Sequence, residues 1–234
     1  PPAGIDVHFD FDVNAGSETI PADASLVFDT GGAWRVLSRG RERFLVHRLE
    51  VAGLPFWVAR FVLGSPDVNV SASPHVRSAA SGQPVDPSTY PLDLVLLMYV
   101  LAERQGVILH GAGVDWDGKG IVLSGISGSG KSTIARLLMA DRGVHGLSDD
   151  RVVVRKIGED WSVWGTPWLG TAGVGTSRRA PLSAVLFLNK AQKSGVRPLD
   201  KSETLKRLLP VVSIPWYEQD LVRPLLDSCE QLMA

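Results

Sequence analysis

The string SGISGSGKST contains the residues with the clearest chemistry in this chain. This string matches the full pattern of a phosphate-binding loop (P-loop, Walker A). The matching residues are Gly125, then after four intervening residues Gly130, Lys131 and Ser132. Glycines let backbone N–H groups turn toward a polyphosphate without a Cβ clash, and a helix predicted to begin near Lys131 adds the positive end of its dipole. The alternative is a glycine-rich turn with a solvated lysine. The residues predicted to bind the nucleotide are Gly125, Ser127, Gly128, Ser129, Gly130, Lys131, Ser132 and Thr133.

The roles expected within this loop follow from the chemistry of polyphosphates. Lys131 is expected to reach the β and γ phosphates as a point charge, and the Ser132 hydroxyl to ligate Mg²⁺. An apolar strand, Ile121–Leu123, precedes the loop, and Thr133–Met139 continues as a helix. This strand, loop and helix order is the context that the motif requires.

Two adjacent carboxylates, Asp149 and Asp150, follow in the segment GLSDDRVVV. Such a pair at a strand edge can hold Mg²⁺ and accept the proton of an acceptor hydroxyl. A second strand after the P-loop helix would return its end beside the phosphates. The alternative is a polar turn before the strand predicted at Val152–Arg155. The apolar run of an ordinary Walker B strand is missing, because Leu147 stands alone before the pair.

Three further polar side chains are candidates for the same site. His110 ends the strand predicted at Val107–His110, where it can contact the γ-phosphate or the acceptor; the alternative is a structural histidine. Arg178 and Arg179 lie in the glycine-rich segment Trp164–Leu182, where paired arginines can clamp an acceptor or stabilise transition-state charge. A solvated loop is an equally good interpretation of the two arginines.

The order VILHGAGVDWDGKGIVLSGISGSGKSTIARLL, followed by LSDDRVVVR, resembles the HPr kinase/phosphorylase family, which is related to the phosphoenolpyruvate carboxykinases. The resemblance covers about Tyr90 to Leu188. It is nearest to the shorter HPr-kinase-like proteins of peptide biosynthetic clusters, such as those of lasso peptides. It implies an α/β fold, with a P-loop domain of the carboxykinase type behind a small β-rich N-terminal lobe.

The resemblance also implies a role for each site residue. Asp149 matches the family's general base and Asp150 its metal ligand, while His110 matches a histidine at the phosphate site. Lys131 and Ser132 match the P-loop lysine and serine. ATP and Mg²⁺ are the implied cofactors, a serine hydroxyl of a protein or peptide is the implied acceptor, and a homo-oligomer is the implied assembly.

The sequence departs from this family at three places, one of which is that the family's downstream Mg²⁺-binding glutamate has no clear counterpart. HPr kinases carry glutamate directly after the P-loop serine, where this chain has Thr133. Their glycine-rich segment that grips HPr is not recognisable, and Trp164–Leu182 stands in its place. These differences argue against HPr as the substrate, and more strongly against phosphorylase activity.

The elements predicted around the site divide the chain into a β-rich lobe, residues 1–88, and a P-loop kinase domain, residues 89–234. The Pro-rich and small-residue segment Ser65–Ser88 is expected to be a loop or lobe boundary. Pro224 is expected to kink or split the last helix. The predicted strands are Ile5–Val13, Ser25–Phe28, Trp34–Leu37, Phe44–Val46, Phe56–Leu63, Val107–His110, Ile121–Ser124, Val152–Arg155, Ser162–Trp164 and Ala184–Leu188, and the predicted helices are Pro91–Gly106, Lys131–Asp141, Ser202–Leu209 and Tyr217–Met233.

The composition is that of an ordinary globular protein. The 234 residues are 44% hydrophobic and 21% charged, and 24 basic residues face 25 acidic ones. A net charge of -1 provides no strong field for nucleic acid or anionic lipid. Cys229 is the single cysteine, and the longest apolar run, Leu94–Ala102, is far shorter than the about 20 residues that span a bilayer. We therefore expect a cytoplasmic protein that binds neither nucleic acid nor a membrane.

Two classes of function fit these features. The first is a kinase that transfers the γ-phosphoryl group of ATP to a hydroxyl, with a serine of a protein or peptide favoured over a small molecule. The second is a nucleotide-gated regulatory NTPase or binding module. The kinase is favoured because the aspartate pair and His110 are more than nucleotide binding needs.

Overall fold

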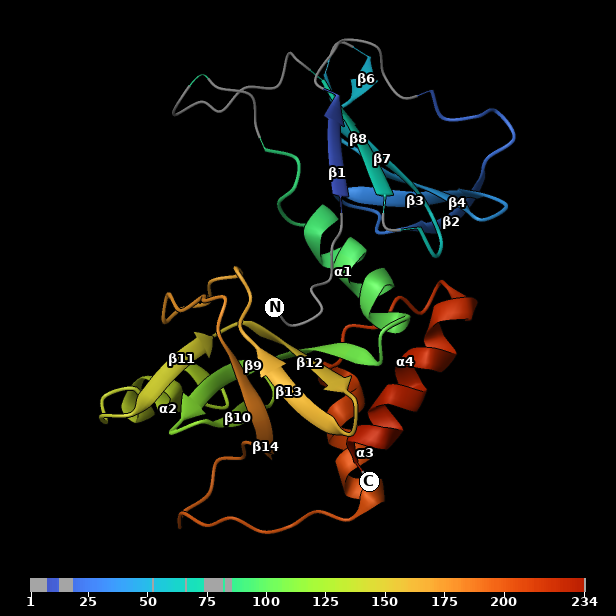
Figure 1. Cartoon of the computed structure of the whole chain (residues 1–234). Coiled ribbons are helices and arrows are strands. Elements are labelled where there is room, and N and C mark those ends of the chain that lie inside the picture. Colours follow the sequence, from blue (N-terminus) through green and yellow to red (C-terminus); the bar gives the residue numbers. More distant parts are fainter. Residues whose placement is uncertain are drawn as a thin grey trace. The chain divides into compact units, whose positions relative to one another are not determined.

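The computed structural model describes residues 8–12, 19–51, 53–65, 67–73, 82 and 86–233. The chain forms two compact units, Pro1–Val100 and Leu101–Ala234, and helix α1 (Leu92–Ala102) runs across the division (Figure 1). The boundary predicted between residues 88 and 89 stays a prediction. Both units mix strands with few helices. None of the helices formed by the described residues combines the length and apolar character needed to cross a bilayer.

The first unit is built on one six-stranded sheet in the order β1-β8-β7-β4-β3-β2. Its core lies where β4 meets β7, because Phe44, Val46 and Val58 bury their side chains together. The strands of this unit are β1 (His8–Asp12), β2 (Ser25–Asp29), β3 (Trp34–Arg39), β4 (Glu42–His47), β7 (Trp57–Val62) and β8 (Asp67–Ala72), with a small ribbon of β5 (Glu50–Val51) and β6 (Leu54–Pro55).

Two expectations for the first unit need correction or restriction. Part of Ser65–Ser88, expected to be a loop, is strand β8, in which Val68, Val70 and Ala72 are buried in alternation. This period of two is the signal of a half-buried strand, and it outweighs the small residues between. Parts of two predicted elements lie outside the described residues. They are residues 5–7 and 13 of the first predicted strand, and residues 74–81 and 83–85 of the predicted loop.

The second unit is built on a six-stranded sheet in the order β10-β14-β13-β12-β9-β11. Strand β10 also pairs with β9, so the pairings β9–β12–β13–β14–β10–β9 close a ring of five strands. Within this ring β10 and β14 are parallel and the other neighbours are antiparallel. The strands are β9 (Gly106–Trp116), β10 (Lys119–Ser124), β11 (Val144–Ser148), β12 (Arg151–Ile157), β13 (Asp160–Trp164) and β14 (Arg179–Phe187).

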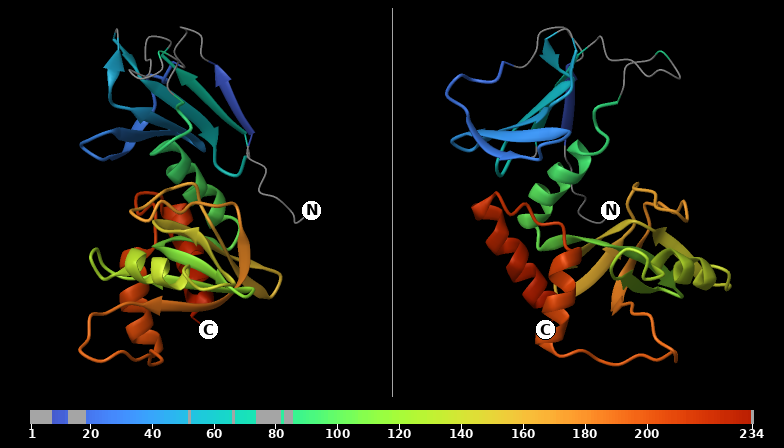
Figure 2. Two further views of the ribbon diagram at one scale, coloured as in Figure 1. Left: turned by 90° about the vertical axis from the view of Figure 1, so that its left-hand side faces the viewer. Right: turned by 180° about the vertical axis from the view of Figure 1, so that it is seen from behind.

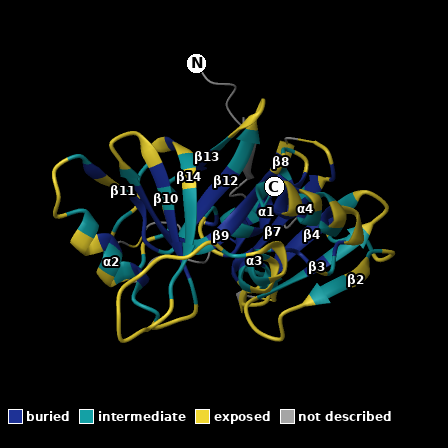
Figure 3. Cartoon of the chain, turned by 90° about the horizontal axis from the view of Figure 1, so that it is seen from below, coloured by how far each residue is buried: buried dark blue, intermediate teal, exposed yellow. Residues whose placement is uncertain are grey.

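The helices of the second unit cover the strands at two separate places. Figure 2 shows α2 (Lys131–Leu138) and α4 (Gln219–Leu232) on opposite sides of these strands. Helix α3 (Lys201–Leu208) and the short 3₁₀ helix η1 (Leu209–Val211) precede α4. Most of the connection from β14 to α3 is exposed, whereas β9 is largely buried (Figure 3).

Several expectations for the second unit differ from the structure. Strand β9 extends past His110 to Trp116, because Ala112 and Val114 are also buried. Strand β14 begins at Arg179, so the end of the predicted glycine-rich segment is strand. Pro224 lies inside α4 without splitting it. Leu221, Leu225 and Cys229 are buried at intervals of four residues, and this packing offsets the hydrogen bond that proline cannot donate.

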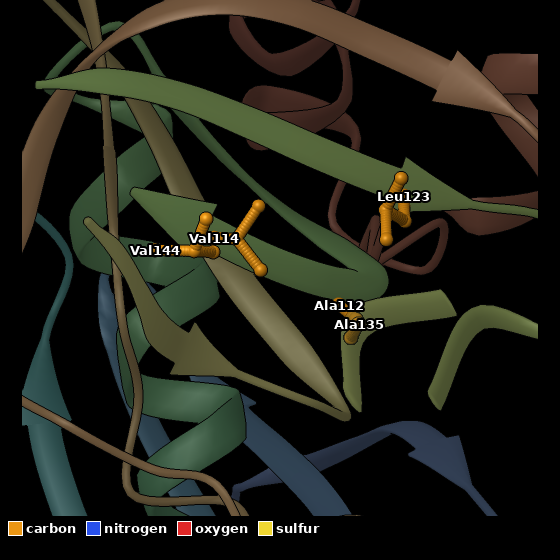
Figure 4. Close-up of a cluster of buried hydrophobic side chains, with 5 residues drawn as sticks. All are labelled: Ala112, Val114, Leu123, Ala135 and Val144. Atoms are coloured by element: carbon orange, nitrogen blue, oxygen red, sulfur yellow. The ribbon is translucent and has the colours of Figure 1, made fainter. Parts of the chain in front are cut away.

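A small apolar cluster holds α2 against the sheet. It comprises Ala112 and Val114 of β9, Leu123 of β10, Ala135 of α2 and Val144 of β11. In Figure 4 Val114 lies beside Val144, and Ala112 beside Ala135. The cluster fixes the end of β10 relative to the start of α2. The loop that joins these two elements, residues 125–130, is therefore anchored at both ends.

Candidate functional site

The loop between β10 and α2 has the backbone geometry that its glycines allow. Gly125, Gly128 and Gly130 have φ of 149°, 75° and 102°, a region that side chains disfavour. Helix α2 begins directly afterwards at Lys131, and no side chain caps its first turn. The positive end of the helix dipole therefore faces this loop.

Lys131 folds back over the loop. Its side-chain ammonium donates hydrogen bonds to the carbonyl oxygens of Gly125 at 2.8 Å and Ile126 at 3.2 Å. The residue is only 8% exposed, and burial lowers the pKa of Lys131, while the charge of Asp150 acts in the opposite direction. The positive charge is thus held at the loop by two carbonyl groups and a nearby carboxylate.

His110 and Asp150 lie beside this lysine. The Nδ1 atom of His110 is 3.6 Å from Oδ1 of Asp150. The Gly111 N–H donates to the Asp150 carbonyl at 3.0 Å, and the Ser124 hydroxyl donates to the His110 carbonyl at 2.9 Å. These bonds tie the end of β10, the middle of β9 and the start of β12 together.

Burial and nearby charges shift the pKa of His110. Burial lowers the pKa of His110, the charge of Lys131 lowers it further, and Asp150 raises it. The charge of Arg151 also lowers this pKa. We expect Lys131→Met to raise the pKa and Asp150→Asn to lower it, because each substitution removes one of the three charges that act on His110. NMR titration of the histidine Cε1–Hε1 signals measures the midpoint, with His110→Gln identifying the signal. The same midpoint in wild type and both variants would show that the three groups do not interact.

The two aspartates have different surroundings. Asp149 is 4% exposed, and its carboxylate accepts the backbone N–H groups of Gly170 at 2.8 Å, Val174 at 3.0 Å and Ala172. Asp150 is more exposed, and its carboxylate accepts a hydrogen bond from the Arg151 guanidinium. Asp150 is therefore the aspartate whose carboxylate lies beside His110.

None of the described contacts joins Arg178 or Arg179 to Lys131, His110 or Asp150. The guanidinium of Arg179 lies 5.8 Å from the centre of the Trp164 ring, and Arg178 is exposed and makes only backbone hydrogen bonds among the described contacts. Sequence reasoning missed Arg151, which pairs with Asp150 and lies 5.9 Å from the centre of the Trp168 ring. Its position directly after the aspartate pair was the available signal.

Two residues, Ser132 and Asp150, are predicted to bind a cation through oxygen atoms. The described residues contain no group of three His, Cys, Asp or Glu side chains arranged to hold a metal. Mg²⁺ does not require such a group, because it is commonly held by one or two carboxylates together with substrate phosphates and water. The Ser132 hydroxyl and the Asp150 carboxylate fit this donor chemistry.

Comparison with known proteins identifies a family. The family model described as SynChlorMet cassette protein ScmC matches residues 91–223, which is more than half of the chain. No curated protein matches. The chain is also similar to the structure of the HPr(Ser) kinase/phosphatase from Coxiella burnetii, with 16% identity and a TM-score of 0.30. That similarity covers 38% of this chain and 64% of the other, less than two thirds of its length, and a likeness this weak does not establish a shared fold.

Proposed function

This chain belongs to the family of the SynChlorMet cassette protein ScmC, and we propose that its second unit transfers the γ-phosphoryl group of ATP to a hydroxyl. The observation that carries the proposal is the grouping of Lys131, His110 and Asp150 beside a glycine-rich loop at the start of α2. A binding module needs the loop and the lysine. A carboxylate that can accept the hydroxyl proton is what transfer adds, and His110 is a further group that binding alone does not need.

The loop supplies the phosphate contacts in this proposal. Backbone groups of residues 125–130 and the ammonium of Lys131 would bind the β and γ phosphates. The Ser129 hydroxyl supports a polar ligand here, because it is buried and has no hydrogen-bond partner among the described residues. Ser132 would hold Mg²⁺, together with Asp150 in the role that the sequence resemblance implies, and the bound ion neutralises charge on the β and γ phosphates.

The transfer itself moves one phosphoryl group and one proton. The acceptor oxygen forms a bond to the γ-phosphorus, and the bond from that phosphorus to the β–γ bridging oxygen breaks, so that ADP leaves. The hydroxyl proton passes to a carboxylate of the Asp149–Asp150 pair. Lys131 stabilises the charge that develops on the leaving phosphate, and His110, whose pKa burial lowers, supplies a hydrogen-bonding group beside it.

The acceptor in this proposal is a serine hydroxyl of a protein or peptide. The support is the sequence resemblance to the HPr kinase/phosphorylase family, whose HPr-gripping segment this chain lacks. The glycine-rich segment with Arg178 and Arg179 would meet an acceptor instead. A homo-oligomer remains a prediction from the same resemblance.

Label transfer tests this function. The full chain is incubated with γ-phosphate-labelled ATP, Mg²⁺ and a size-fractionated lysate of the source organism, with Lys131→Met as the inactive control. We expect label in a peptide or protein fraction, lost with the control. Label in a small molecule other than phosphate would retain the kinase and remove the protein acceptor. Free phosphate alone would contradict transfer and favour a nucleotide-gated NTPase.

A further inference from the structure

The aspartate pair lies in the short connection between β11 and β12, and its two side chains make different contacts. Both of these strands pair with β9, and the bond from the Gly111 N–H to the Asp150 carbonyl continues the pairing across the connection. The backbone of the pair is therefore held in place. The sheet therefore determines which neighbouring groups each of the two carboxylates can contact.

The Asp149 carboxylate lies in a concavity formed by backbone N–H groups. Gly170, Ala172 and Val174 contribute alternate N–H groups to the two carboxylate oxygens. Such an arrangement of main-chain donors binds anions, and bonds from N–H groups to a charged acceptor are stronger than neutral ones. The Asp149 N–H completes the connection by donating to the Val174 carbonyl at 3.1 Å.

The segment that Asp149 holds also approaches the pair closely. A Cβ atom on Gly170 would lie 2.7 Å from the Asp149 carbonyl oxygen and 2.8 Å from its Oδ2. The segment is attached again on either side, where the Ser148 hydroxyl donates to the Trp168 carbonyl at 3.3 Å and the Thr176 N–H donates to the Leu147 carbonyl at 2.9 Å. We call residues 168–176 the Asp149-held loop.

The Asp149-held loop borders the candidate site. The Trp168 ring at its beginning lies under the Arg151 guanidinium, and the same guanidinium pairs with Asp150. Leu169, the next residue, is 65% exposed. A side chain that fixes this loop therefore fixes a surface beside Asp150, His110 and Lys131.

We propose that Asp149 is a positioning residue that holds this loop for the acceptor, and that Asp150 is the carboxylate that takes the acceptor proton. In this proposal Mg²⁺ would be held by Ser132, phosphate oxygens and water, and Asp150 gives up the metal-ligand role that the sequence resemblance implies. The role of Asp149 in holding the loop is inferred from the contacts alone. The role of Asp150 in accepting the proton rests on the proposed function. The proposal reassigns the general-base role that sequence resemblance implies for Asp149. In the transfer step the hydroxyl proton moves to Asp150, while Asp149 keeps its three N–H bonds.

Amide hydrogen exchange on the full chain tests whether Asp149 holds residues 168–176 in place. Asp149→Asn retains the shape of the side chain but replaces one acceptor oxygen with a donor group. We expect exchange of the amides in residues 168–176 to become at least about tenfold faster in Asp149→Asn and to stay unchanged in the matched variant Asp150→Asn. Unchanged exchange in Asp149→Asn would overturn the proposal. Should that variant not fold, Gly170→Ala disturbs the same contact from the loop side and is expected to give the same acceleration.

Steady-state transfer tests the role of Asp150, at saturating ATP and with varied concentrations of the peptide or protein fraction that takes up label in the experiment above. For Asp149→Asn we expect the KM for the acceptor to rise about tenfold while kcat stays within about threefold of wild type. For Asp150→Asn we expect kcat to fall by about 100-fold or more. A kcat lost in Asp149→Asn, with loop exchange unchanged, would make Asp149 the base. Absence of transfer in the wild-type chain would remove the proposed function, and the exchange result would still decide what Asp149 holds.

Discussion

Lys131→Met is expected to weaken the binding of ATP by at least about 100-fold, which corresponds to about 2.7 kcal/mol. Methionine keeps the unbranched shape of the side chain and removes its charge. In the structure the ammonium is bound to two loop carbonyl groups, and phosphate oxygens would replace these partners when a nucleotide binds. The loss is large because the charge acts at a partly desolvated site, where a charge-assisted bond is worth more than at the surface. Isothermal titration calorimetry with Mg·ATP measures the affinity.

Lys119→Met is the matched control for this experiment. Lys119 begins β10, the strand that ends at the loop, and its side chain is exposed. Removing its charge changes the net charge of the chain by the same amount without touching residues 125–131. We expect wild-type affinity for this control. Equal affinities for wild type and Lys131→Met would mean that the loop does not bind phosphate.

Gly165→Ala is expected to destabilise the second unit by about 3 kcal/mol or more. A Cβ atom at this position would lie 2.2 Å from the Thr176 carbonyl oxygen and 2.4 Å from the Leu147 carbonyl oxygen. Neither atom can move freely, because the Thr176 N–H is bonded to the Leu147 carbonyl and the Gly165 N–H to the Arg178 carbonyl. For a chain of this length the loss corresponds to a fall in Tm of about 6–12 °C. Thermal unfolding followed by circular dichroism or calorimetry measures it.

Gly195→Ala provides the comparison for this stability prediction. Gly195 lies in the same unit, and a Cβ atom there would meet nothing within 4 Å. We expect a Tm within about 2 °C of wild type, as for other exposed positions. A Gly165→Ala protein as stable as Gly195→Ala would contradict the close approach of the three backbone segments.

The strand, loop and helix around Lys131 could be predicted from the sequence because the residues that determine them are contiguous. The glycines, Lys131 and the apolar strand before them specify a strand, a loop and a helix within one short segment, and β10 and α2 occur at that place. The helix was predicted to continue to Asp141 but ends at Leu138, where the chain turns toward β11. Boundaries depend on packing that a local pattern does not encode.

The aspartate pair shows where sequence reasoning stops. The two residues are chemically identical and adjacent, so no local pattern distinguishes them. Their difference comes from Gly170, Ala172 and Val174, whose N–H groups reach Asp149 from a segment more distant along the chain. Strand β8 was missed for a related reason, since its buried valines alternate with residues typical of loops. Contacts made at long range decide such cases.

The parallel pairing of β10 with β14 also sets an order of events when the second unit folds. β9 and β10 are joined by a tight turn at residues 117–118, so they meet early, as local contacts do. β14 reaches β10 only after the chain has been made as far as Phe187, and closing that long intervening segment is entropically costly. Until then the strand that ends at Gly125 has a neighbour on one side only. The strand that leads into residues 125–130 is thus among the last parts of this unit to gain all its neighbours as the chain leaves the ribosome.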